Sequence, residues 1–99
     1  MKNYYKVIRF LKKNLPIHNK ITIRRTKMPK SLDGDCKCIN NVFIIRIDKD
    51  LPEFYAIEVL THELAHAIAW DKEGDVHGPH WGKAYSLVYR KLLLFTFDS

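Results

Sequence analysis

Apolar residues recur at helical spacing near the start of the chain, and this pattern predicts a first helix over residues 2–14. Lysine and arginine occupy most of the intervening positions, so one face of the helix would be buried and the other charged. Pro16 restricts the residue before it to extended backbone, and we expect the helix to end there. The residues expected on its buried face are Tyr4, Val7, Ile8, Leu11 and Leu15.

The pattern then changes to the alternation that is typical of strands. Residues 20–26 alternate and are rich in β-branched side chains, which favours a strand. Residues 34–47 read as a hairpin that turns at Asn40 and Asn41, because asparagine tolerates the positive φ that a two-residue turn requires. Three strands of this kind predict a small antiparallel sheet.

The hairpin register determines which side chains share a face of this sheet. With the turn at Asn40 and Asn41, Cys38 faces Phe43 and Cys36 faces Ile45 on one side. Two cysteines on one strand are poorly placed to bridge each other, so we interpret both as small buried side chains. The pairs expected on the other side are Lys37 with Ile44 and Asp35 with Arg46.

Helical spacing returns after Pro52, which suits the first turn of a helix, with Asp50 as a candidate cap. We expect this helix to reach about Trp70 and Gly74 to break the chain, before Pro79 opens a last helix. The buried stripe expected for the first of these helices is Phe54, Ile57, Leu60 or Thr61, Leu64 and Ile68. The inner face expected for the second is Trp81, Ala84, Tyr85, Val88, Leu92 and Phe95.

The composition fits one globular domain over residues 1–99, with 46% apolar residues in 99. The elements together predict an α+β fold: an N-terminal helix, a three-stranded antiparallel sheet, a central helix and a C-terminal helix. No apolar run approaches the roughly 20 residues of a membrane span, and the start lacks the apolar core of a signal peptide. We therefore expect an intracellular, cytoplasmic protein that does not enter the membrane.

Charge is distributed unevenly along the chain. The net charge is +6, with 17 Lys and Arg against 11 Asp and Glu, and most of the cationic residues precede residue 51. This basic N-terminal half could bind the phosphates of a nucleic acid or an acidic protein, or it could simply be a solvated surface. Charge alone does not choose among these partners.

The strongest chemical signal lies in the helix that follows Pro52. His62 and His66 are four residues apart, so their imidazoles would leave the same face of the helix one turn from each other. With Glu63 between them they form an H-E-x-x-H pattern, in which two histidines hold zinc and the glutamate acts as a general base. The alternative is a helix whose histidines merely lie on a polar face.

A catalytic zinc site takes three protein ligands and leaves one position for water. Three residues after the helix could supply the third ligand: Glu73, His77 and His80. The intervening loop is long enough to bring His77 back towards the metal, and Gly78-Pro79 would restrict its position. This favours His77, although His80 and Glu73 stay open on the residues alone.

The two motifs together resemble the SprT-like (Spartan-type) zinc metallopeptidases and their small phage or mobile-element relatives. The resemblance covers residues 52–95 and implies a minimal zincin-like fold with one zinc ion on His62, His66 and His77, and Glu63 as the base. The connection from His66 to His77 is shorter than in larger members, and we do not expect the C-terminal zinc ribbon that those members carry. The segments that carry the resemblance are His62-Glu63-Leu64-Ala65-His66-Ala67 and His77-Gly78-Pro79-His80-Trp81.

These features predict hydrolysis of peptide bonds in a protein or peptide substrate. Zinc would lower the pKa of its water to about 7, and Glu63 would carry the proton to the leaving amine. Tyr85 and His80 are candidate donors to the developing oxyanion, although the spacing of Tyr85 also suits the core. The alternative is a non-catalytic, zinc-stabilised basic module that binds nucleic acid or protein, with His80 as a fourth ligand.

Overall fold

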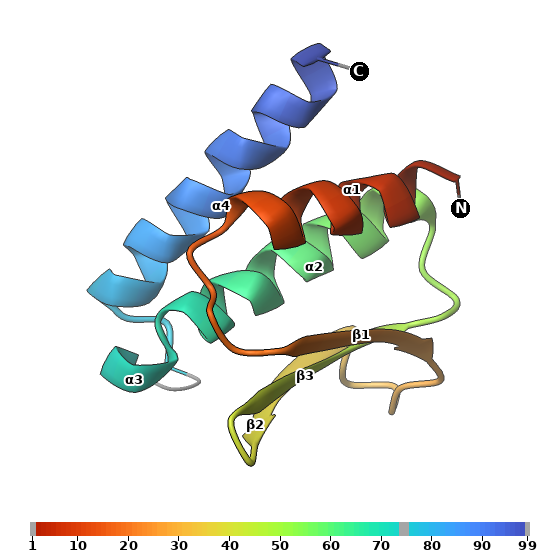
Figure 1. Ribbon diagram of the computed structural model, residues 1–99. Coiled ribbons are helices and arrows are strands. Elements are labelled where there is room, and N and C mark those ends of the chain that lie inside the picture. Colours follow the sequence, from red (N-terminus) through yellow and green to blue (C-terminus); the bar gives the residue numbers. More distant parts are fainter. Residues whose placement is uncertain (1, 74–75, 99) are drawn as a thin grey trace.

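The computed structural model describes residues 2–73 and 76–98, and in it helices cover one face of a three-stranded sheet (Figure 1). This agrees with the α+β class predicted from the sequence. The elements in chain order are α1 (Lys2–Asn14), β1 (Ile21–Thr26), β2 (Gly34–Ile39), β3 (Val42–Asp48), α2 (Glu53–Ile68), α3 (Trp70–Glu73) and α4 (Pro79–Asp98).

The sheet is mixed, so the prediction of an entirely antiparallel sheet is wrong. Its strand order is β1-β3-β2, with β1 parallel to β3 and β2 antiparallel to β3. The physical reason is the apolar character of β3, which suits the central position where a strand is paired on both sides. After β1, the segment 27–33 crosses to the far edge of the sheet, where β2 lies. The hairpin turn then brings β3 back into the central position between β2 and β1.

The hairpin itself has the predicted turn and register. Asn40 and Asn41 have φ values of 51° and 63°, the positive region that the turn requires. Cys38 lies opposite Phe43 and Cys36 opposite Ile45, as expected. Both cysteines are free thiols that are half-buried against the core. The other face carries the predicted pairs, Lys37 with Ile44 and Asp35 with Arg46.

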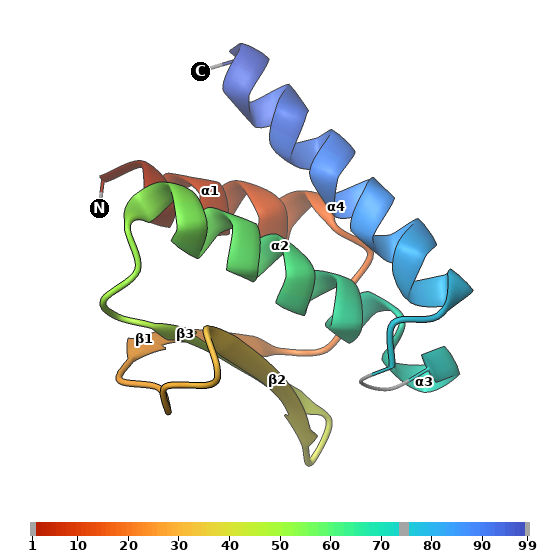
Figure 2. The ribbon, with the colours of Figure 1, turned by 180° about the vertical axis from the view of Figure 1, so that it is seen from behind.

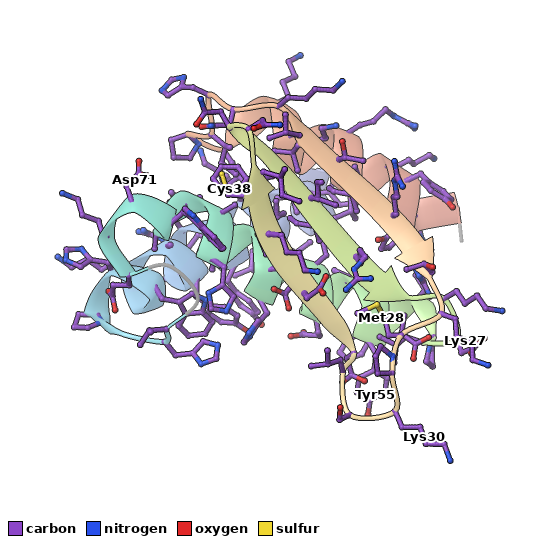
Figure 3. All side chains as sticks on the ribbon, turned by 90° about the horizontal axis from the view of Figure 1, so that it is seen from below. Lys27, Met28, Lys30, Cys38, Tyr55 and Asp71 are labelled. Atoms are coloured by element: carbon purple, nitrogen blue, oxygen red, sulfur yellow. The ribbon has the colours of Figure 1, made fainter. Side chains whose placement is uncertain are left out.

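The core lies between the inner face of the sheet and the helices. Figure 2 shows α2 directly above the sheet, with α4 crossing on the side away from the strands, whereas Figure 3 shows the outer sheet face with no helix over it. None of the described helices combines the length and the apolarity needed to cross a bilayer. The buried core residues are Tyr4, Val7, Leu11, Leu15, Ile21, Phe43, Ile45, Ile47, Ala56, Leu60, Leu64, Ala67 and Val88.

The start of α2 is organised differently from the prediction. Pro52 is the N-cap residue and no side chain caps the helix, so Asp50 does not have the predicted role. The Glu53 carboxylate instead accepts hydrogen bonds from the backbone N–H groups of Asn3 and Tyr4, at 3.1 and 3.0 Å. A carboxylate stabilises the positive end of a helix, so the first residue of α2 caps α1.

Two further expectations for this helix are corrected. Phe54 is 70% exposed rather than buried, because the helix turns that position away from the sheet. The helix also ends at Ile68, and Trp70–Glu73 form the separate short helix α3, whereas one continuous helix to about Trp70 was expected. The predicted break at Gly74 lies outside the described residues.

Neighbouring isoleucines of β3 give a test of the register. Ile45 is fully buried beneath α2, so Ile45→Ala should lower the free energy of unfolding by about 2–5 kcal/mol through loss of contacts and a new cavity. Ile44 is half-buried on the uncovered outer face, and Ile44→Ala should cost only about 1 kcal/mol. Urea unfolding of both variants measures the difference, and equal losses would contradict this placement of the two faces.

Candidate metal centre

The two histidines of the helical motif project from α2 towards one point. They lie one turn apart, and their Nε2 atoms are 3.2 Å from each other. His66 is buried, with 5% of its surface exposed, whereas His62 is half-buried nearer the surface. Helical spacing puts the two rings on one face of α2, and the core residues of the helix fix the direction in which this face points.

His77 completes a triangle of imidazoles. It lies just before α4, and its Nε2 atom is 3.0 Å from Nε2 of His62 and 3.0 Å from Nε2 of His66. Zinc–nitrogen bonds of 2.0–2.1 Å in a tetrahedral site place ligand nitrogens about 3.3 Å apart, so the triangle fits such an ion closely. Among the described residues these three histidines form the one group of potential metal ligands. His77 is exposed, which leaves this side of the centre open to solvent.

The other candidates for the third ligand have different positions. The Glu73 carboxylate accepts hydrogen bonds from the backbone N–H of His80 and, at 3.2 Å, from that of Trp81. It therefore caps the N-terminus of α4, where a negative charge interacts favourably with the positive end of the helix dipole. A Cβ at Gly78 would overlap this carboxylate, so glycine gives the cap its room immediately after His77.

His80 lies outside the imidazole triangle. Its side chain is exposed and lines a different hollow, with Lys72 and Lys83, on the other side of the start of α4. It is therefore not placed as a fourth ligand or as an oxyanion donor. The expectation that it could assist the site is not supported by its position.

Trp81 forms the wall behind the three imidazoles. Its ring centroid lies 4.7 Å from that of His77, 5.1 Å from that of His62 and 5.7 Å from that of His66. Its indole N–H also donates to the backbone carbonyl of His62 at 3.4 Å. Its helical spacing predicted a core position, although the aromatic residue after the His-Gly-Pro segment was the signal that could have identified it as part of the site.

Glu63 lies beside the imidazoles and is only 6% exposed. Strand β2 approaches it closely at Gly34, where an added Cβ would lie 2.7 Å from both the Arg46 carbonyl and the Val59 side chain. The same Cβ would lie 3.7 Å from the Glu63 carboxylate. Glycine at this position thus allows the edge strand to enclose the glutamate.

Burial also determines the protonation of these groups. Loss of solvent, with a smaller effect of the Asp35 carboxylate, raises the pKa of Glu63 to about 7. Desolvation and the two neighbouring imidazoles lower the pKa of His62 to about 4, so this ring is neutral at physiological pH. A neutral imidazole and a carboxylate that titrates near neutrality are the forms required for metal binding and for general base catalysis.

A cavity of about 350 Å³ opens next to His62 and Glu63. Tyr85 of α4 lines it, together with Asp33, Gly34, Glu58 and Val59. Burial, with Glu58 and Tyr89 nearby, raises the pKa of Tyr85, so its hydroxyl remains a donor at neutral pH. The structure therefore places Tyr85, one of the two auxiliary candidates, at the site, although its spacing also suited the core.

Metal titration distinguishes the third ligand from its neighbour. His77→Ala should weaken binding of zinc or cobalt(II) by about a hundredfold or more, because loss of an outer-shell partner alone costs about 10–100-fold. His80→Ala is the matched control and should bind both ions like the wild type, since this ring faces another hollow. Calorimetry or the visible spectrum of cobalt measures the affinities. Equal effects of the two substitutions would contradict the triangle.

The raised pKa of Glu63 predicts a pH-dependent stability in the metal-free protein. The folded state binds the proton more tightly than the unfolded state, whose pKa is near 4.5, so this contribution to stability is lost as the pH rises from about 4.5 through 7. As the pH rises from 5 to 8, the free energy of unfolding of Glu63→Gln should therefore increase by on the order of 1–2 kcal/mol relative to that of the wild type. Urea unfolding with a chelator measures the difference, which should be near zero if the carboxylate is solvated.

Comparison of the chain with protein-family models, curated proteins and solved structures yields no match. The likeness to the SprT-like peptidases therefore rests on the residues of the two motifs. What the site can do follows from its own chemistry: three converging imidazoles, an adjacent buried carboxylate and an open cavity with a phenol at its side.

Proposed function

We propose that this protein is a zinc-dependent metallopeptidase of the SprT-like, zincin type. The observation that carries the proposal is the combination of an open triangle of three Nε2 atoms with a buried glutamate beside it. A purely structural zinc site is normally closed by a fourth protein ligand and has no need of such a carboxylate. Catalysis by water attack needs both the open side and the base.

The roles of the chain's residues follow from their positions. His62, His66 and His77 would hold one zinc ion, which supplies an activated water and a Lewis acid for the scissile carbonyl. Glu63 accepts the proton of the attacking water and donates it to the leaving amine, for which a pKa near 7 is well suited. Tyr85, whose hydroxyl stays protonated, is the candidate donor to the oxyanion.

Strand β2 is the candidate guide for an extended substrate. It is an edge strand, paired with β3 on one side, and its first residue Gly34 lines the cavity beside Glu63. A peptide can add to such a free edge through backbone hydrogen bonds, which are independent of its sequence. This would bring a scissile carbonyl past the imidazole triangle.

The second candidate is a zinc-stabilised basic module that binds nucleic acid or protein without catalysis. Its support is α1, which carries no acidic residue and exposes a row of cationic side chains. These cations are Lys6, Arg9, Lys12 and Lys13. This alternative gives Glu63 no role, although burial of an ionisable carboxylate is costly.

Measurement of zinc content and casein cleavage in parallel tests the peptidase. Wild type and Glu63→Gln should each hold one zinc per chain, while cleavage should fall by about 10²–10⁴-fold in the variant, which lacks the base. A chelator should abolish the wild-type activity and added zinc should restore it. Asp71→Asn, a change of an exposed carboxylate in α3, is the matched control and should cleave like the wild type.

The other outcomes discriminate between the candidates. Cleavage that requires added DNA would indicate a peptidase that acts on DNA-associated proteins. Zinc in both proteins with no cleavage by either, together with retention on DNA, would support the binding module. Absence of zinc from the wild type, or equal cleavage by both proteins, would overturn the peptidase proposal.

A further inference from the structure

The cavity beside Glu63 differs in charge from the rest of the molecule. The chain carries 17 Lys and Arg, yet no lysine or arginine of the described part of the chain lines this cavity. Three carboxylates line it instead. Asp33 precedes β2, whereas Glu58 and Glu63 both belong to α2, with Glu58 one turn before His62. A strongly basic protein thus has an acidic hollow next to its candidate metal centre.

These carboxylates are not neutralised by the protein itself. The nearby Asp35 forms a two-contact ion pair with Arg46, which lowers the pKa of Asp35. By contrast, no ion pair joins Asp33, Glu58 or Glu63 to a described lysine or arginine. Glu63 lines the cavity with only 6% of its surface exposed. Its carboxylate has no hydrogen-bond partner among the described residues. No described lysine or arginine therefore pairs with Asp33 or Glu58, the two carboxylates of the hollow that have no part in the proposed reaction.

The remaining lining suits the stem of a long side chain. Val59 and the ring of Tyr85 provide apolar surface between the carboxylates. A lysine or arginine can lay its methylene groups along such a surface while its charged head reaches the acids. The volume of about 350 Å³ is within the range of small ligand sites, and the free edge of β2 passes the cavity mouth at Gly34.

We propose that this cavity is a subsite for a positively charged side chain, lysine or arginine, that adjoins the scissile bond of the substrate. The inference rests on the proposed peptidase function and deepens it by naming the substrate class. Asp33 and Glu58 determine this specificity, because they are the carboxylates of the cavity that take no part in the reaction itself. The peptide N-terminus has the same ammonium chemistry, but an edge strand that continues past the cavity favours an internal residue.

Mapping of cleavage sites in unfolded casein by mass spectrometry is the first test. Lysine or arginine should be enriched at one fixed position beside the cleaved bond. Peptides with that sequence, acetylated and amidated at their ends, then carry lysine, norleucine or glutamate at this position. The wild type should cleave the lysine peptide with a kcat/KM about tenfold above that of the norleucine peptide, and the glutamate peptide more slowly still.

The variant Asp33→Asn/Glu58→Gln tests the residues that we hold responsible. Its preference for lysine over norleucine, taken as the ratio of the two kcat/KM values so that any general loss of activity cancels, should fall to less than about twofold. Asp71→Asn is the control, since Asp71 projects at the opposite end of the molecule from the loop that leads into β2 (Figure 3), and it should keep the full preference. A preference unchanged in the double variant would overturn the proposal.

Failure of this subsite and failure of the peptidase give different results. Equal cleavage of the three peptides, or cleavage only of peptides with a free N-terminus, would overturn the subsite and leave the peptidase intact. If nothing is cleaved, fluorescence anisotropy with zinc-loaded protein decides. Tighter binding of the lysine peptide that is lost in the double variant would support the subsite, and equal binding of the lysine and norleucine peptides would overturn it.

Discussion

The structure depends above all on the packing of α2 between the sheet and α4. Leu60 and Leu64 are fully buried, and small residues such as Ala65 allow the neighbouring elements to approach closely. A helix held in this way cannot turn or slide without opening the core. The directions of His62, Glu63 and His66 are therefore set by residues that have no chemical role, and Gly34 brings the edge strand close enough to shield the glutamate from water.

Local features were predictable from the sequence because their causes are local. The ends of α1, the hairpin turn at Asn40 and Asn41 and the pairing of His62 with His66 all depend on residues within a few positions of each other. The parallel pairing of β1 with β3 was missed because it depends on which strand gains most from the central position. No spacing within a strand carries that information.

The candidate site shows the same division. The two candidate ligands His62 and His66 follow from helical periodicity. The third depends on how the chain returns after Ile68, which left Glu73, His77 and His80 open. The structure separates them through the cap that Glu73 forms on α4, a contact between residues seven positions apart. The acidic cavity was not predicted, since Asp33 and Glu58 meet only through the packing of the hairpin against α2.

The mixed sheet also has a consequence for the order of folding. Strands β2 and β3 are joined by a two-residue turn, so they can pair by a local encounter on the microsecond timescale. The parallel pairing of β1 with β3 joins strands that are separated in the chain by the whole of β2, so we expect it to be a slower, non-local step. On this expectation, the strand that encloses Glu63 belongs to the part of the sheet that forms by local contacts, and β1 completes the opposite edge.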